Sequence, residues 1–229
     1  MIAFFACAYA LAYFALLPRL ARGTSPTSAG RRAGLLALVH AAILLPVGWG
    51  VATAVAVLAA AVAHVAVDEL GARLLRRVRV SGAEAGLAWI AAHLAVVVAL
   101  TEWWGRVASD DWSAPPGSAQ LALLVAILAF NGHGAGDLVG AVLATLQSEG
   151  ADAGPKGAGR RIGMLERWIV VVLVAMGEWG AVGLVLTAKS VARFKKMDDQ
   201  AFAETYLVGT MTSVLIAMAT GLLLRSAGW

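Results

Sequence analysis

Several near-continuous apolar stretches of about 18 residues or more constrain the fold of this chain more than any other feature. A stretch of that length is long enough for one helix to cross the hydrocarbon core of a bilayer. The composition agrees, because 60% of the 229 residues are hydrophobic and 14% are charged, whereas ordinary soluble domains carry about 25% charged residues. The sequence therefore predicts an all-α fold, a polytopic transmembrane helix bundle.

The apolar pattern predicts about seven spans in one integral membrane domain, residues 1–229, because no polar segment between them is long enough to fold separately. The predicted spans are residues 2–17, 33–48, 51–75, 83–104, 119–147, 163–188 and 203–224. Pro46, Gly48 and Gly50 divide the second from the third at a tight turn. The fifth contains Asn-Gly-His-Gly-Ala-Gly-Asp at 131–137, where dense glycine predicts a broken helix. A re-entrant segment is the alternative to a single crossing there.

Clusters of Lys and Arg lie between the apolar stretches, within a formal net charge of +4. This placement indicates membrane topology, since no basic and aromatic residues alternate as they do on a nucleic-acid surface. The first cluster follows the first apolar stretch, so we expect a retained span and not a cleaved signal peptide. We therefore expect a multi-pass protein of the cell inner (plasma) membrane, with the bilayer as its partner and no nucleic-acid partner.

All four histidines lie within apolar segments: His40, His64, His93 and His133. His64 precedes Asp68 by four residues, and His133 precedes Asp137 by four, a spacing that places both side chains on one helix face. Such a pair can bind a metal, relay protons or orient an imidazole. We expect the histidines to converge in the bundle core; the alternative is that each simply holds a neighbouring helix by a hydrogen bond. A metal ion is possible at these two pairs, but the spacing is common by chance, so no cofactor is predicted.

Glu178 is the strongest single candidate, because it lies beside Trp179 near the middle of the predicted span 163–188. Ionisable residues at membrane depth are costly and are functional candidates by default. Burial would favour the neutral carboxylic acid, which suits a general acid or a proton carrier. The alternative is a structural hydrogen bond from Glu178 to Thr210 or Ser213 of the last span.

Six side chains predicted within the spans are the candidates for binding a substrate: Trp179, Trp89, His40, Asn131, Thr210 and Ser213. An aromatic face beside a buried acid can stabilise a cationic intermediate, although packing also explains both tryptophans. Glu166 and Arg167, by contrast, are expected at the membrane surface as interfacial anchors.

The last third of the chain carries three motifs: GMLER from Gly163, GEWGAVG from Gly177 and YLVGT from Tyr206. With the spacing of His40, His64, Asp68 and His93, these motifs resemble the bacterial polytopic membrane family catalogued as domain of unknown function 3307, most strongly over residues 159–213. The resemblance implies a shared helical membrane fold and no activity. The acid that the family places shortly before His93 is missing here, where Trp89 stands, and the first helix lacks the family's His-xxx-Asp-xxx-Gln pattern. Part of an ancestral polar site is therefore expected to be lost or repurposed.

Two functions are compatible with these residues. The expected one is a membrane-embedded enzyme that uses buried carboxylates for acid/base chemistry on a lipid-soluble substrate such as an isoprenoid, by analogy with small helical membrane terpene cyclases. Its catalytic residues would be Glu178, Asp137, His133, Asp68, His64 and His93. The alternative is a small proton-coupled transporter, or an accessory membrane protein without catalytic activity, with the glycine-rich segment 131–137 as its binding site.

Overall fold

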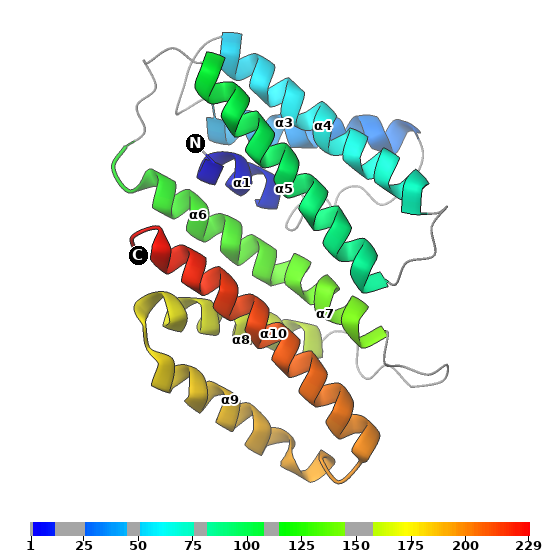
Figure 1. Ribbon diagram of the computed structural model, residues 1–229, viewed down its shortest axis with the longest axis vertical. Coiled ribbons are helices and arrows are strands. Elements are labelled where there is room, and N and C mark those ends of the chain that lie inside the picture. Colours follow the sequence, from blue (N-terminus) through cyan, green and yellow to red (C-terminus); the bar gives the residue numbers. More distant parts are fainter. Residues whose placement is uncertain (1, 12–25, 45–50, 76–81, 108–114, 145–157) are drawn as a thin grey trace. The chain divides into compact units, whose positions relative to one another are not determined.

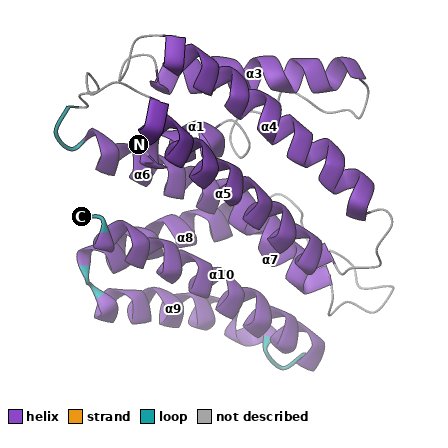
Figure 2. Ribbon diagram, turned by 45° about the horizontal axis from the view of Figure 1, so that its top comes forward, coloured by secondary structure: helices purple, strands orange, loops and turns teal. Residues whose placement is uncertain are grey.

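The structure is a computed structural model that describes residues 2–11, 26–44, 51–75, 82–107, 115–144 and 158–229 (Figure 1). These residues form helices and connecting turns without any strand (Figure 2), so the prediction of an all-α fold is confirmed for them. They divide into two compact units, unit 1 from Met1 to Phe130 and unit 2 from Asn131 to Trp229. A single bundle of seven spans is therefore not confirmed.

Four of the described helices are long and apolar enough to cross a membrane: Val51–Gly71, Glu84–Arg106, Ser118–Ala144 and Gln200–Ser226. They coincide with four of the predicted spans, which supports a membrane protein. The predicted span 2–17 is described as a helix only to Ala10, and residues 12–17 lie outside the described residues. The predicted span 33–48 is represented by a shorter apolar helix, Arg32–Leu44, and the predicted turn at Pro46 also lies outside the described residues.

Unit 1 contains α1 (Ile2–Ala10), α3 (Pro26–Leu44), α4 (Val51–Leu75), α5 (Gly82–Val107) and α6 (Ser118–Ala129). The short helix α1 packs against α3, α5 and α6, while α4 packs against α3 and α5. Phe5 and Tyr9 of α1 are buried, as are its alanines at positions 8 and 10. A helix that is apolar all round belongs in a core, and α1 places its aromatic side chains among the other helices of the unit.

Unit 2 contains α7 (Ala135–Ala144), α8 (Ala158–Met176), α9 (Trp179–Arg193), a short 3-10 turn (Phe194–Lys196) and α10 (Gln200–Ser226). The long helix α10 packs mainly against α8 and α7. Gly221 makes the approach of α10 to α8 possible, because a Cβ atom there would lie 2.8 Å from Cβ of Val174 and 2.9 Å from the carbonyl oxygen of Val171. Small residues permit such close helix packing in membrane proteins.

The prediction of one helix over residues 163–188 is wrong, because the chain turns back at Gly177. This glycine has φ +81°, and its N–H donates to the carbonyl of Val174 at 3.0 Å while that of Glu178 donates to Leu173 at 2.8 Å. The two bonds are those of a Schellman motif, in which a left-handed glycine ends a helix. α8 and α9 consequently form a helical hairpin (Figure 1).

The glycine-rich segment does not break its helix as predicted. Residues Phe130–Gly134 form a turn of π-helix between α6 and α7, and the helical run continues from Ser118 to Ala144. A re-entrant loop would interrupt this run, so the described backbone favours a single helical segment. Single-turn π segments occur frequently at functional sites, and here the carbonyl of Asn131 in this turn accepts a hydrogen bond from Arg167.

Candidate functional site

Three histidine side chains from three helices meet in the core of unit 1. His40 on α3, His64 on α4 and His93 on α5 are all fully buried. The ring centroids of His40 and His64 are 5.7 Å apart, and those of His64 and His93 are 5.3 Å apart with ring planes only 6° from parallel. Tyr9 of α1 stacks on two of them, at 4.7 Å from His64 and 5.2 Å from His93. These four residues, with Asp68 and Trp89, are called the histidine cluster below.

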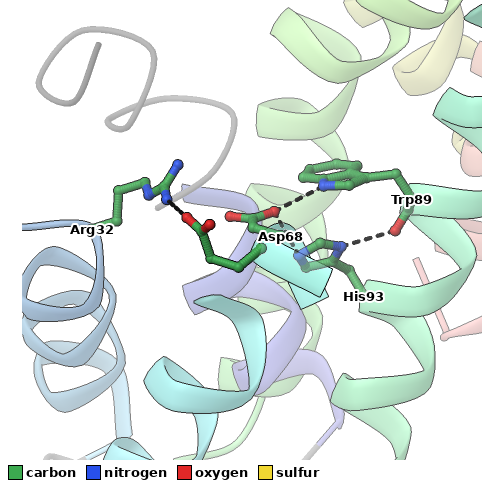
Figure 3. Close-up of polar contacts among 5 residues, drawn as sticks. Arg32, Asp68, Trp89 and His93 are labelled. Atoms are coloured by element: carbon green, nitrogen blue, oxygen red, sulfur yellow. Dashed lines mark hydrogen bonds and ion pairs between the residues drawn. The ribbon is translucent and has the colours of Figure 1, made fainter. Parts of the chain in front are cut away.

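Asp68 supplies the carboxylate of the histidine cluster from α4 (Figure 3). Its Oδ1 atom accepts a hydrogen bond of 2.9 Å from the indole Nε1–H of Trp89 and lies 3.4 Å from Nε2 of His93. Two groups on α5 therefore converge on one oxygen of α4. This arrangement gives Trp89 a polar role where the sequence suggests only packing or a substrate contact.

The tautomer of His93 follows from its second contact. Its Nδ1 atom lies 2.8 Å from the backbone carbonyl oxygen of Trp89, one helical turn earlier. A carbonyl oxygen only accepts hydrogen bonds, so Nδ1 must carry a proton. In a neutral imidazole Nε2 would then turn a lone pair towards the oxygen of Asp68. A further proton held by the Asp68–His93 pair, on the imidazole or on the carboxyl group, would let these two atoms, 3.4 Å apart, form a hydrogen bond.

The acidic residue next to Asp68 has an ion-pair partner of its own. Glu69, the next residue on α4, forms an ion pair with the guanidinium of Arg32 from α3 (Figure 3).

His40 makes the same type of backbone contact as His93, because its Nδ1 lies 2.8 Å from the carbonyl oxygen of Leu36. His40 therefore also carries its proton on Nδ1.

The predicted convergence of the histidines is confirmed for three of the four. His133 lies in the π-helical turn and belongs to unit 2. Its predicted partner Asp137 is exposed on α7 and forms an ion pair of 2.6 Å with Arg160 of α8. Among the residues that the structure describes, no group of three His, Cys, Asp or Glu side chains is arranged to hold a metal ion.

The expected position of Glu178 is wrong. Because α8 ends at the Schellman turn, Glu178 lies exposed at the start of α9, where its side chain makes no capping hydrogen bond. Trp179 beside it is 47% exposed. Burial therefore no longer distinguishes Glu178 from the other carboxylates. Ser213, a predicted hydrogen-bond partner of Glu178, instead accepts from Nη1 of Arg167 at 3.4 Å.

The predicted position of Arg167 is also wrong. It was expected at the membrane surface but is only 4% exposed. Its Nε donates to the backbone carbonyl of Asn131 in the π-helical turn at 2.7 Å, and the Asn131 side chain donates to Thr220 at 3.0 Å. Val170, Val171 and Val174, which follow at helical spacing, are buried too; this shared face was the available signal.

No protein-family model, no curated protein and no solved structure matches this chain. The resemblance of residues 159–213 to domain of unknown function 3307 therefore stays a prediction from the motifs, and the function has to be argued from the side chains themselves.

Proposed function

We propose that the protein transfers protons within a membrane through the Asp68–His93 pair, and that it belongs to the proton-coupled class rather than to the enzymes. One observation carries this proposal. The carbonyl of Trp89 holds a proton on Nδ1 of His93, while Nε2 faces Asp68 at 3.4 Å. A pair arranged in this way has room for one additional proton between two groups that can both exchange it.

The neighbouring imidazoles provide a path away from this pair. The side chain of Asp68 is 14% exposed and gives access from outside the core, whereas that of His93 is fully buried. The ring of His64 lies against those of both His93 and His40. An imidazole accepts a proton on one nitrogen and donates from the other. Because the rings of His64 and His93 lie face to face, a proton passes between them only through a ring rotation or a bridging water molecule.

The packing of the histidine cluster supports proton transfer better than catalysis on a lipid-soluble substrate. Its own stacked rings, 4.7 to 5.3 Å apart around Tyr9, His64 and His93, occupy the space beside the acid. A cavity of about 380 Å³ is present in unit 2, and no member of the histidine cluster lines it. The expected terpene cyclase-like chemistry also relied on a buried Glu178, which the hairpin turn exposes.

Proton flux into liposomes tests the proposal directly. The purified full-length protein is placed in vesicles that contain a pH-sensitive dye, and proton entry is followed after a pH jump. We expect flux from the wild type and little from Asp68→Asn. Asparagine keeps an oxygen for the Trp89 indole but cannot exchange a proton in the physiological range.

The matched control is Glu69→Gln, which makes the same chemical change one residue away. Glu69 pairs with Arg32 and lies outside the histidine cluster, so flux should remain at the wild-type level. Equal flux from the wild type and Asp68→Asn, with both proteins folded and inserted, would exclude the proposed role of the pair.

A further inference from the structure

A cavity of about 380 Å³ lies among α7, α8, α9 and α10 of unit 2. This volume falls within the range of about 300–1,000 Å³ that ligand sites occupy. The polar groups in its lining are basic side chains and hydroxyl groups: Arg160, Arg167, Lys189, Arg193, Thr205, Tyr206, Thr210 and Ser213. None of the residues lining this cavity is acidic.

Acidic partners are present for two of the four cations at this cavity. Asp137 pairs with Arg160, and Glu166 pairs with Lys189. Among the described residues, Arg167 and Arg193 have no ion pair with a carboxylate. Arg193 instead lies over the ring of Tyr206, with its guanidinium carbon 5.8 Å from the ring centroid. The cavity therefore keeps an excess of positive charge.

Arg167 is the most unusual of these cations because it is 4% exposed. Its Nε and Nη1 atoms contact the carbonyl of Asn131 and the hydroxyl of Ser213, but its Nη2 has no hydrogen-bond partner among the described residues. The buried hydroxyl group of Tyr206 has none either. A buried charge without a counter-ion is costly, and a buried donor that faces a cavity can be satisfied there by water, an ion or a ligand.

Two glycines leave room around the guanidinium of Arg167. A Cβ atom at Gly136 would lie 3.2 Å from Nη2, and one at Gly163 would lie 3.4 Å from Nη1. Side chains at these positions would crowd the guanidinium, so the absence of both keeps its donors accessible. The absence of a side chain at Gly136 in particular leaves space beside Nη2 of Arg167.

We propose that this cavity binds the phosphate group of an anionic ligand, with Arg167 as its principal contact. A guanidinium presents a planar pair of N–H donors that matches phosphate oxygens. The excess charge from Arg167 and Arg193 suits the divalent charge of a phosphate monoester. Val139, Leu143 and Phe202 add apolar surface to the lining, which favours a lipid phosphate headgroup, although free phosphate has the same recognition chemistry. This site is independent of proton transfer in unit 1.

Binding is tested on the full-length protein in neutral detergent by its melting temperature, since a ligand that binds the folded state raises it. The probes are inorganic phosphate against sodium chloride at equal ionic strength, and phosphatidic acid against phosphatidylcholine in mixed micelles. Stabilisation by phosphatidic acid alone identifies a lipid headgroup as the source. Stabilisation by both phosphate probes to the same extent identifies the phosphate group alone as sufficient. Stabilisation by neither overturns the proposal.

Two variants locate the site. Arg167→Gln removes the central charge and should weaken binding of the effective probe about ten- to a hundredfold. Because this change also leaves the carbonyl of Asn131 without its donor, Gly140→Leu provides a second test. Gly140 lines the cavity on the same helix face as Gly136, and a Cβ there meets nothing within 4 Å. Leucine should therefore fill the cavity without disturbing the fold.

The matched control is Gly183→Leu on α9. A Cβ at Gly183 also meets nothing within 4 Å, and this residue does not line the cavity. Both substitutions gain helix propensity, so both proteins should be at least as stable as the wild type. Binding should be lost in Gly140→Leu and retained in Gly183→Leu. Wild-type affinity in a folded Gly140→Leu protein would show that the ligand does not enter this cavity.

Discussion

Asp68 receives two groups of α5 on a single carboxylate oxygen, and the nearer ring nitrogen of His93 lies 3.4 Å from it. The other ring nitrogen of His93 is bound to a backbone carbonyl. This relationship between Asp68 and His93 distinguishes the histidine cluster from a merely aromatic core, because it places two titratable side chains next to each other. The predictions below separate the structural contribution of each side chain from its contribution to proton transfer.

Asp68→Ala should lower the free energy of unfolding by about 1–3 kcal/mol, because the indole N–H of Trp89 would lose its buried acceptor. Asp68→Asn should change it much less, since the amide oxygen replaces the carboxylate oxygen. Unfolding in detergent, followed by tryptophan fluorescence, compares the two variants. Equal stability of the alanine and asparagine variants would show that the bond from Trp89 contributes nothing.

His64→Ala should lower the free energy of unfolding by about 2–5 kcal/mol, because it empties the space between the rings of Tyr9, His93 and His40. His64→Phe keeps an aromatic ring in the stack and should cost less. Phenylalanine has no nitrogen, however, so the vesicle assay should record reduced proton flux. Wild-type flux from a folded His64→Phe protein would remove His64 from the proposed path.

Gly177→Ala should destabilise unit 2 by about 1–2 kcal/mol, because alanine is strained at φ +81° and its Cβ would collide with the guanidinium of Arg225. Gly180→Ala is the control, since a Cβ there meets nothing within 4 Å in the first turn of α9. It should leave stability unchanged or raise it slightly. Melting temperatures that fall equally in both variants would argue against the hairpin turn.

Glu178→Gln should change the free energy of unfolding by less than about 0.5 kcal/mol, as expected of an exposed side chain outside any described network. Proton flux should also be unaffected. A loss of flux comparable with that of Asp68→Asn would restore Glu178 as a functional acid.

The sequence predicts the helical class and the convergence of His40, His64 and His93, because their positions within apolar stretches and their spacing are local properties. It does not predict that Asp68 contacts His93 on another helix, since the four-residue spacing along α4 predicts His64 as the partner of Asp68. Asp68 of α4 lies next to His93 of α5, and Trp89 contacts both of them. Such a contact depends on how α4 and α5 pack, which no local pattern encodes.

The prediction for unit 2 was wrong for a different reason. Gly177 is followed by Glu178 and Trp179 in an apolar context, and hydropathy alone continues a helix through them. Gly177 could have indicated the end of α8, because glycine commonly ends a helix in the left-handed conformation. The apolar residues on both sides favoured a continuous helix instead. Arg167 was misplaced because a charge next to Glu166 suggests a solvated surface. Its buried guanidinium instead donates to the carbonyl of Asn131, a contact between α8 and the π-helical turn that no local sequence pattern reveals.

The proton positions on His93 test the central claim most directly. Nitrogen NMR of the protein labelled at histidine distinguishes Nδ1 from Nε2 and reports which of them is protonated. We predict that Nδ1 carries a proton throughout, and that the signal of Nε2 in the wild type reports a proton shared with Asp68. Asp68→Asn should abolish that sharing, whereas Glu69→Gln should not alter it. A neutral His93 with its only proton on Nε2 would contradict the proposed pair.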